Sequence, residues 1–268
     1  MHPPPPHAVA RILTHVTGAE VSPGDMRTAL VSKHTDRMVQ RIGVGDAHYF
    51  VKAFDPAREE ARTACAREVF AMTSLRDTGL APRLVAFDRA DAFIITEEVP
   101  GQMLETVLTA DTLAARAFQI GEWSARYIVH QPRRDTDIDW FDYLRQYSGI
   151  VTPATQAEAN QQFSGRPTPQ FALAKHDQSP KNFILTPTHT LIGLDFERSR
   201  FKPMGWDVIA AAAALLKRFP ERENDILAPL CAGWDSARQG DTPEIAQDIL
   251  AFFARQASHI DWARAPYK

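Results

Sequence analysis

The stretch AKHDQSPKNFILTPTHTLIGLDFE, residues 174–197, places polar side chains at both ends of two short apolar runs. The runs flank the turn-forming sequence Pro-Thr-His-Thr, so we expect an antiparallel hairpin. If the hairpin is symmetric about residues 188–189, Asn182 lies opposite Asp195. Side chains directly opposite one another in such a pair are about 5 Å apart at Cβ. The sequence therefore predicts that these two side chains meet at the open end of the hairpin.

An amide oxygen beside a carboxylate oxygen suits Mg²⁺, which takes few protein ligands and fills its shell with water and phosphate oxygens. Taken singly, Asn182 and Asp195 are better explained by local turn contacts. Asp177 precedes Asn182 by five residues, and a proline stiffens the loop between them. A carboxylate there can orient an attacking hydroxyl and accept its proton, or it can serve as a turn cap. The whole pattern, D-x-x-x-x-N followed by a strand, a turn and LDFE, favours one shared site.

A second candidate pair lies far from this stretch. Lys52 interrupts the apolar run HYFVKAF, and lysine is seldom buried without a partner. In the helical segment that follows, Glu68 lies on the same face as the apolar residues Cys65, Val69 and Met72. We therefore expect an ion pair between Lys52 and Glu68. Such a pair is either structural or sets the lysine against a bound phosphate.

Composition excludes several classes of protein. The 268 residues are 44% hydrophobic and 24% charged, with a net charge of −3. This is typical of a globular chain with a core, and it provides no basic field for binding nucleic acid. The two cysteines, Cys65 and Cys231, indicate a reducing compartment. No apolar run approaches the ~20 residues of a membrane span. We expect a cytoplasmic protein that binds neither nucleic acid nor membranes.

The chain changes character near residue 100. Strand-like runs at 28–32, 37–43, 48–54, 82–88 and 92–99 surround one helical segment, and the later chain is mostly helical. The prediction is an α+β fold of two lobes. It has an N-terminal tail over 1–20, partly flexible and polyproline-like, a small antiparallel-sheet lobe with one helix over 21–99, and a larger, mostly helical lobe over 100–268.

These residues resemble the aminoglycoside phosphotransferase and choline kinase families, relatives of the protein kinases, from about residue 28 to 217. The resemblance implies a bilobal protein-kinase-like fold, with residues 21–99 as the nucleotide-binding lobe. Lys52 matches the phosphate-binding lysine, and Glu68 matches the glutamate that pairs with it. FIITEEVPG resembles the hinge beside the adenine pocket, which places Glu97 and Val99 near the base through backbone groups.

The resemblance also gives roles to the opening stretch. HDQSPKN resembles the catalytic loop, with Asp177 as the base and Asn182 as a metal ligand. LDFE resembles the metal-binding segment, with Asp195 bridging Mg²⁺ to the phosphates. GWDVIAAAAALL resembles the helix whose aspartate, here Asp207, braces the catalytic loop without being catalytic.

The chain departs from the family pattern at four places. The histidine of the common H-G-D sequence is replaced by Lys175, and His176 directly precedes the aspartate. The loop after the first strand has no glycine-rich signature, so Ser32 and Thr35 are the candidates for covering the phosphates. Lys181 either neutralises the transferring phosphoryl group or is a solvated lysine.

The implied function is ATP- and Mg²⁺-dependent transfer of a phosphoryl group to a hydroxyl of a small-molecule acceptor, such as an amino alcohol, an aminoglycoside or a sugar, by a monomer or homodimer. Two alternatives stay open. One is a weakly catalytic, pseudokinase-like nucleotide-binding module. The other is a kinase acting on a lipopolysaccharide sugar or on a protein, although twelve residues between Asp195 and Asp207 leave little room for a peptide-docking loop.

The acceptor site is less well defined by the sequence. The segment RRDTDIDWFDYLRQY, residues 133–147, groups four aspartates with three aromatic residues, a composition suited to a cationic or sugar-like acceptor. The same segment fits an acidic helix start with aromatic residues in the core, and this is the interpretation that we favour. We likewise expect Trp206, Trp234 and Trp262 to pack in the core.

Overall fold

The structure is a computed structural model that describes residues 3–145, 152–166, 168–245 and 247–256. The chain forms two compact units. The first comprises Met1–Gly101 together with Ile192–Arg198, and the second comprises Gln102–Leu191 together with Ser199–Lys268. The chain passes from the first unit to the second after Gly101, close to the division near residue 100 that the sequence suggested. The return of Ile192–Arg198 to the first unit was not predicted, because a hairpin pattern carries no information about which unit its ends join.

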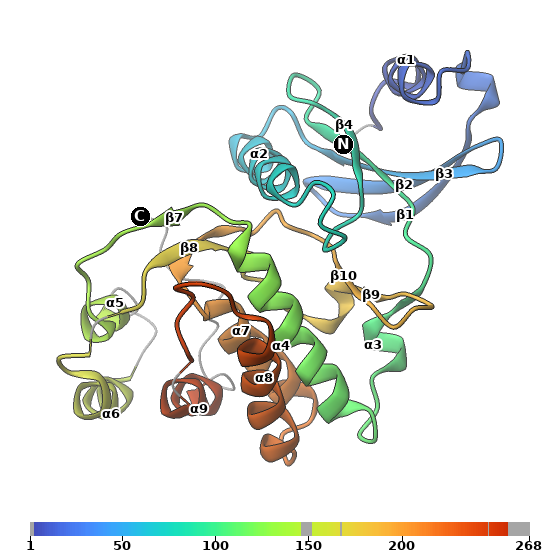
Figure 1. The fold of residues 1–268 in the computed structure, drawn as a ribbon. Helices are drawn as coiled ribbons and strands as arrows, with labels where there is room; N and C mark the ends of the chain where they lie inside the picture. Colours follow the sequence, from blue (N-terminus) through green and yellow to red (C-terminus); the bar gives the residue numbers. More distant parts are fainter. Residues whose placement is uncertain (1–2, 146–151, 167, 246, 257–268) are drawn as a thin grey trace. The chain divides into compact units, whose positions relative to one another are not determined.

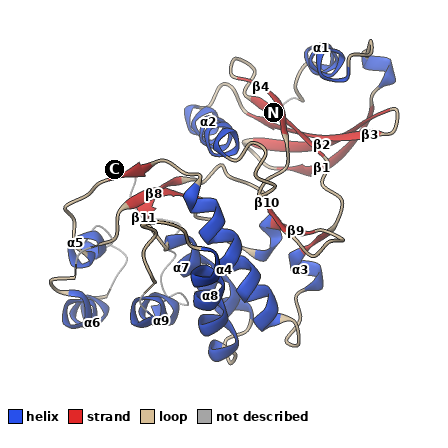
Figure 2. Ribbon diagram, viewed as in Figure 1, coloured by secondary structure: helices blue, strands red, loops and turns tan. Residues whose placement is uncertain are grey.

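A five-stranded antiparallel sheet forms the centre of the first unit (Figures 1 and 2). Its order is β1-β2-β3-β5-β4, and the predicted strands are confirmed. The strands are β1 (Arg27–Lys33), β2 (Arg37–Val44), β3 (Ala47–Phe54), β4 (Leu84–Asp88) and β5 (Phe93–Glu97).

The two faces of this sheet carry different helices. Val51 and its alternate neighbours pack against helix α1 (Pro6–Thr17), whose Val9, Ala10 and Leu13 are buried with them. Successive strand side chains point to opposite faces. Lys52 therefore lies on the other face, where it meets helix α2 (Glu59–Ser74).

Helix α1 corrects the expectation of a partly flexible polyproline tail. Pro5 is its N-cap and Pro6 occupies its first turn, a position where proline is favoured because its missing N–H has no helical partner. A short 3₁₀ helix, η1 (Pro23–Asp25), precedes the sheet. Helix α2 begins at Glu59, after a turn in which Asp55 Oδ1 accepts the backbone N–H of Ala57.

Helices make up most of the second unit, so the predicted α+β class is confirmed. Helices α4 (Leu113–Val129) and α8 (Glu223–Ala237) pack closely at Gly121 and Gly233, which have no side chain. A Cβ atom at either glycine would overlap the backbone of the partner helix. The other helices are α3 (Leu104–Val107), α5 (Trp140–Arg145), α6 (Pro153–Phe163), α7 (Trp206–Arg218) and α9 (Gln247–Gln256). Of these, α6 lies in the polar segment 152–170, whose composition favours a loop.

Two small sheets carry the loops of interest. One has the order β11-β8-β7, from β7 (Arg133–Arg134), β8 (Phe171–Ala174) and β11 (Arg200–Pro203). The other has the order β10-β9-β6, from β6 (Gln102–Met103), β9 (Phe183–Leu185) and β10 (Leu191–Gly193).

The predicted hairpin of β9 and β10 exists, but its centre differs. The N–H of Thr186 bonds the carbonyl of Thr190, which centres the turn on Thr188 rather than between residues 188 and 189. Asn182 belongs to the 3₁₀ helix η2 (Pro180–Asn182), and Asp195 follows the end of β10. The register argument for placing Asn182 opposite Asp195 was therefore wrong.

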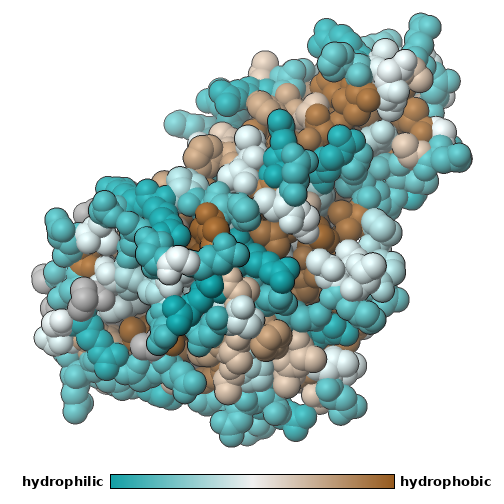
Figure 3. All heavy atoms as spheres, in the orientation of Figure 1, coloured by the Kyte–Doolittle hydropathy of each residue, from teal (hydrophilic) through white to brown (hydrophobic). Residues whose placement is uncertain are grey.

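On the face drawn in Figure 3, hydrophilic residues cover much of both units, and hydrophobic residues lie among them. Among the described residues, the exposed large hydrophobic side chains are Leu30, Val31, Phe70, Phe87, Phe118 and Phe201. Isolated exposed apolar residues are normal on a folded protein. Within the same residues, no helix has both the length and the apolar character that crossing a membrane requires.

Candidate active site

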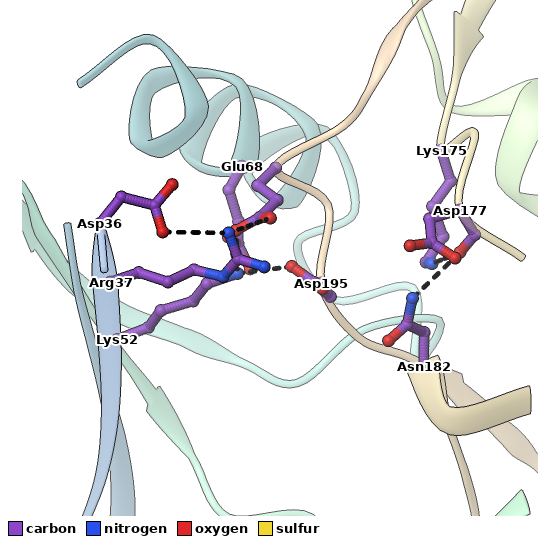
Figure 4. A network of polar contacts seen from close by, with 9 residues as sticks. Asp36, Arg37, Lys52, Glu68, Lys175, Asp177, Asn182 and Asp195 are labelled. Carbon is purple, nitrogen blue, oxygen red and sulfur yellow. Dashed lines mark hydrogen bonds and ion pairs between the residues drawn. The ribbon is translucent and has the colours of Figure 1, made fainter. Parts of the chain in front are cut away.

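Lys52 is the centre of a buried polar cluster in the first unit. Its Nζ donates to Glu68 Oε2 at 2.7 Å and to Asp195 Oδ1 at 2.5 Å (Figure 4). Strand β3 supplies the lysine, helix α2 supplies Glu68, and the segment after β10 supplies Asp195. The predicted ion pair between Lys52 and Glu68 is confirmed.

Glu197 is a member of this cluster that the sequence analysis missed. Its Oε2 lies 2.9 Å from Lys52 Nζ, and its Oε1 lies 3.1 Å from Arg37 Nη1 on the neighbouring strand β2. Arg37 also lies 3.5 Å from Asp36. No regular spacing predicted this contact, because Asp195 has a left-handed φ of +61° and Glu197 lies in a turn.

Electrostatics in the cluster follow from burial and the close carboxylates. Burial alone lowers the pKa of Lys52, but Glu68, Asp195 and Glu197 outweigh it and raise that pKa above its ordinary value. Burial raises the pKa of Glu68, and Lys52 opposes that rise. The lysine therefore stays charged, and its charge holds three carboxylates together.

The same carboxylates have the donor chemistry that a divalent cation needs. Oxygen atoms of Glu68, Asp195 and Glu197 lie within 4.8 Å of one another. Hard oxygen ligands suit Mg²⁺. Asp195 is the most accessible of the three, with 29% of its side chain exposed against 5% or less for the two glutamates. Asp195 is thus the carboxylate of the three that is most open to a cation from solvent.

The loop that contains Asp177 lies in the second unit, between β8 and η2. The carboxylate of Asp207, on the first turn of α7, accepts the backbone N–H of Lys175 at 3.0 Å and that of His176 at 2.8 Å. The predicted bracing contact of Asp207 is confirmed. Burial raises the pKa of Asp207, against hydrogen bonds that lower it.

Asp177 itself is half-buried, and its Oδ1 accepts the N–H of Ser179 at 3.3 Å. Its backbone carbonyl accepts from Asn182 Nδ2 at 3.4 Å. The structure thus brings Asp177 and Asn182 together within one loop. Asp195 belongs to the other unit, so a shared metal site of Asn182 and Asp195 stays a prediction.

His176 has a φ of +76°, in the left-handed region that side-chain-bearing residues rarely adopt. Glycine occupies that position in H-G-D and tolerates such a φ without strain, so His176 adopts a strained conformation in its place. The His176 side chain is buried, with 5% of the residue exposed.

The remaining predicted nucleotide-binding residues are placed as follows. Ser32 lies at the end of β1 and is half-buried, and Thr35 lies exposed in the turn before β2. Glu97 ends β5, its side chain pairs with Arg83, and its backbone N–H bonds the Arg83 carbonyl at 3.0 Å. Val99 follows it and is half-buried, and Lys181 is exposed in η2. Their binding roles stay predictions.

The aromatic residues proposed as alternatives for an acceptor site pack in the core where the structure describes them. Trp140 and Tyr143 are buried, with their rings 5.9 Å apart. Trp206 and Trp234 are buried as well, and Trp262 lies outside the described residues. A cavity of about 350 Å³ in the second unit is lined by Trp140, Met204, Gly205 and Ile245 among others, but by none of the predicted site residues.

Solved structures that resemble this chain share one architecture. Macrolide 2′-phosphotransferase MphH from Brachybacterium faecium matches with a TM-score of 0.60 and 13% identity, over 94% of this chain and 87% of that one. A choline/ethanolamine kinase family protein from Mesorhizobium loti matches with a TM-score of 0.59 and 17% identity, over 87% and 76%. Choline kinase LicA from Streptococcus pneumoniae matches with a TM-score of 0.56 and 15% identity, over 93% and 88%.

The chain has the fold of these small-molecule kinases. The predicted protein-kinase-like architecture is therefore confirmed. No family model matches the sequence, and no curated protein matches it. At 13–17% identity the likeness extends to the fold, and the activity has to be argued from the side chains.

Proposed function

We propose that this protein transfers the γ-phosphoryl group of ATP, in the presence of Mg²⁺, to a hydroxyl of a small-molecule acceptor. The observation that carries the proposal is the position of Lys52 between Glu68 and Asp195. A charged lysine whose carboxylate partner is partly accessible can exchange that partner for a phosphate oxygen and keep the buried glutamate as its anchor. Phosphoryl transfer depends on such positioning and charge neutralisation.

In this proposal the residues divide the work as the sequence analysis predicted. Lys52 binds the non-transferred phosphates, with Ser32 and Thr35 covering them and Lys181 near the transferred group. Backbone groups at Glu97 and Val99 bind adenine. Asp195 and Asn182 hold Mg²⁺, which supplies neutralisation of the phosphate charge.

Asp177 acts at the acceptor. Its carboxylate orients the acceptor hydroxyl and takes up the proton as the oxygen–phosphorus bond forms, while ADP leaves with the electron pair of the broken bond. The hydrogen bond from the N–H of Ser179 to Oδ1 supports this role, because it orients the carboxylate. The other oxygen, Oδ2, is then the proposed proton acceptor.

The nucleotide in this proposal is supported by relatives of the same fold. LicA has been solved with AMP, and an aminoglycoside phosphotransferase, APH(4)-Ia, has been solved with ADP and hygromycin B. The acceptor class follows the same comparison, since those proteins are named for choline, ethanolamine, macrolides and aminoglycosides. We propose an amino alcohol, an aminoglycoside or a sugar for this chain.

The test is a transfer screen with γ-labelled ATP and Mg²⁺ over amino alcohols, aminoglycosides and sugars, repeated with GTP. The proposal expects label in one acceptor class, and none when Mg²⁺ is removed by chelation. Nucleotide binding without transfer to any acceptor would favour the pseudokinase-like alternative. Transfer to a protein substrate alone would overturn the small-molecule assignment.

A further inference from the structure

Lys175 is a fully buried lysine directly before the loop that carries Asp177, with 0% of the residue exposed. A lysine is almost never fully buried unless its charge is compensated. Here Nζ donates to the backbone carbonyl of Asp177, and it lies 5.4 Å from the centroid of the Phe183 ring. The ammonium group of Lys175 therefore binds the loop that carries Asp177. Because the residue is fully buried, it does not contact a nucleotide or an acceptor directly.

The Asp177 carbonyl is a shared acceptor. Besides Lys175, it receives Asn182 Nδ2 at 3.4 Å, a long contact that holds weakly on its own (Figure 4). Lys175 thus fixes the atom through which the proposed base and the proposed metal ligand are connected. A shift of this carbonyl would move both side chains.

The loop is also held from its other side. Asp207 accepts the backbone N–H groups of Lys175 and His176, and the positive charge of Lys175 lowers the pKa of Asp207 against the effect of burial. The carboxylate of Asp207 therefore binds two successive N–H groups of the backbone, and the ammonium group of Lys175 binds the carbonyl that follows them. Between them lies the left-handed His176, a conformation that persists only where its surroundings enforce it.

We propose that Lys175 is a positioning residue for the phosphoryl transfer, an inference that rests on the function proposed above. Its ammonium group fixes the backbone of Asp177 and, through the shared carbonyl, the side chain of Asn182. Loss of the ammonium group frees the loop without removing any group that binds nucleotide. The expected effect is therefore on the rate of transfer and not on the affinity for ATP.

The test compares Lys175→Met, which keeps the length and apolar stem of the side chain, with Lys217→Met, an exposed lysine at the end of α7. We expect Lys175→Met to lower kcat by about tenfold to a hundredfold, since small displacements of catalytic groups cost about this much. The Kd for ATP should change by less than about threefold. Lys217→Met should match the wild type in both.

Hydrogen exchange separates positioning from general destabilisation. In Lys175→Met, backbone exchange should increase in residues 174–182 and stay unchanged in α4 and α8. If Lys175→Met does not fold, Phe183→Leu provides a second test, because it keeps an apolar side chain at this buried position and removes the ring that contacts the ammonium group. Because the ammonium group keeps its bond to the Asp177 carbonyl in this variant, kcat should fall by less than in Lys175→Met, by about twofold to fivefold.

Three outcomes would overturn the inference. The first is wild-type kcat in both variants. The second is a loss of ATP affinity as large as the loss of kcat. The third is increased exchange throughout the second unit, which would make Lys175 an ordinary core residue. If the wild type transfers phosphate to no acceptor, the proposed function fails separately, and exchange in residues 174–182 still decides whether Lys175 holds the loop.

Discussion

Lys52 and Lys175 are both buried lysines in contact with residues of the proposed mechanism, yet they are bound differently. Lys52 contacts three carboxylates, of which Asp195 is partly exposed. Lys175 contacts a backbone carbonyl and an aromatic ring. A carboxylate contact can be exchanged for a phosphate oxygen without moving the chain, whereas a contact to the backbone fixes the chain. The comparison indicates that Lys52 binds a ligand and that Lys175 shapes the loop.

The largest expected effect comes from removing the ammonium group at the centre of the carboxylate cluster. Lys52→Met leaves Glu68, Asp195 and Glu197 close together without the ammonium group that contacts all three. Breaking a buried ion pair from one side costs about 3–5 kcal/mol, so we expect the free energy of unfolding to fall by about this amount at pH 7. Urea denaturation measures it.

The pH dependence of that variant has a definite sign. Burial already raises the pKa of Glu68, and without the lysine that pKa lies further above its unfolded value. The stability that the protonated form of Glu68 contributes is present at low pH and is lost as the pH rises through the raised pKa. Lys52→Met should therefore regain stability between pH 7 and pH 5. Glu197→Gln is the control, and an equal loss in that variant would show that Lys52 is not the centre of the cluster.

Lys202 sharpens the comparison as a third buried lysine. Its Nζ lies 5.1 Å from the Trp206 ring centroid and 5.5 Å from that of Tyr143, and burial together with Arg200 lowers its pKa to about 7. A lysine with a depressed pKa contributes stability above its unfolded pKa, and this is lost as the pH falls through about 7. The free energy of unfolding of the wild type should therefore rise between pH 7 and pH 10.

The rise from Lys202 should be up to about 1.4 kcal/mol for each pH unit. Lys202→Met removes that contribution, so the difference between wild type and variant isolates it in urea denaturation at pH 7 and pH 9. A difference that stays constant with pH would show that Lys202 is bound as firmly in its charged form as Lys52 is.

A smaller effect is expected at His176, which has a φ of +76° and lies between Lys175 and Asp177 in the loop. Asparagine tolerates this region better than most residues, and β-branched residues tolerate it worst. His176→Val should be about 1–3 kcal/mol less stable than His176→Asn and should transfer phosphate more slowly. Thermal unfolding of the two variants checks this, and equal stability would mean that the left-handed turn is not enforced.

Local patterns predicted much of the fold. Alternating apolar residues located all five strands of the first sheet, and helical spacing placed Glu68 against Lys52. Helix α1 was missed because four prolines were interpreted as a polyproline tail, although Val9 and Leu13 have helical i, i+4 spacing. Helix α6 was missed although Thr152 caps its start and Pro153 follows, a common helix beginning.

Contacts between distant segments were harder to predict. Glu197 reaches Lys52 and Arg37 because Ile192–Arg198 packs in the first unit, and no local pattern encodes that return. The contact of Lys175 with the Asp177 carbonyl depends equally on the left-handed turn at His176. The sequence alone showed that Lys175 and His176 depart from the family pattern. The backbone geometry was needed to show that Lys175 binds the Asp177 carbonyl and that His176 is left-handed.

The most direct test of the account is Asp177→Asn, measured for both transfer and binding. This change keeps the shape of the side chain and removes the proton acceptor. We expect transfer of label from γ-labelled ATP to fall by about 10²–10⁴-fold, the usual contribution of a general base, while calorimetry shows an ATP affinity close to that of the wild type. Near-normal turnover in Asp177→Asn would contradict the assignment of Asp177 and the mechanism built on it.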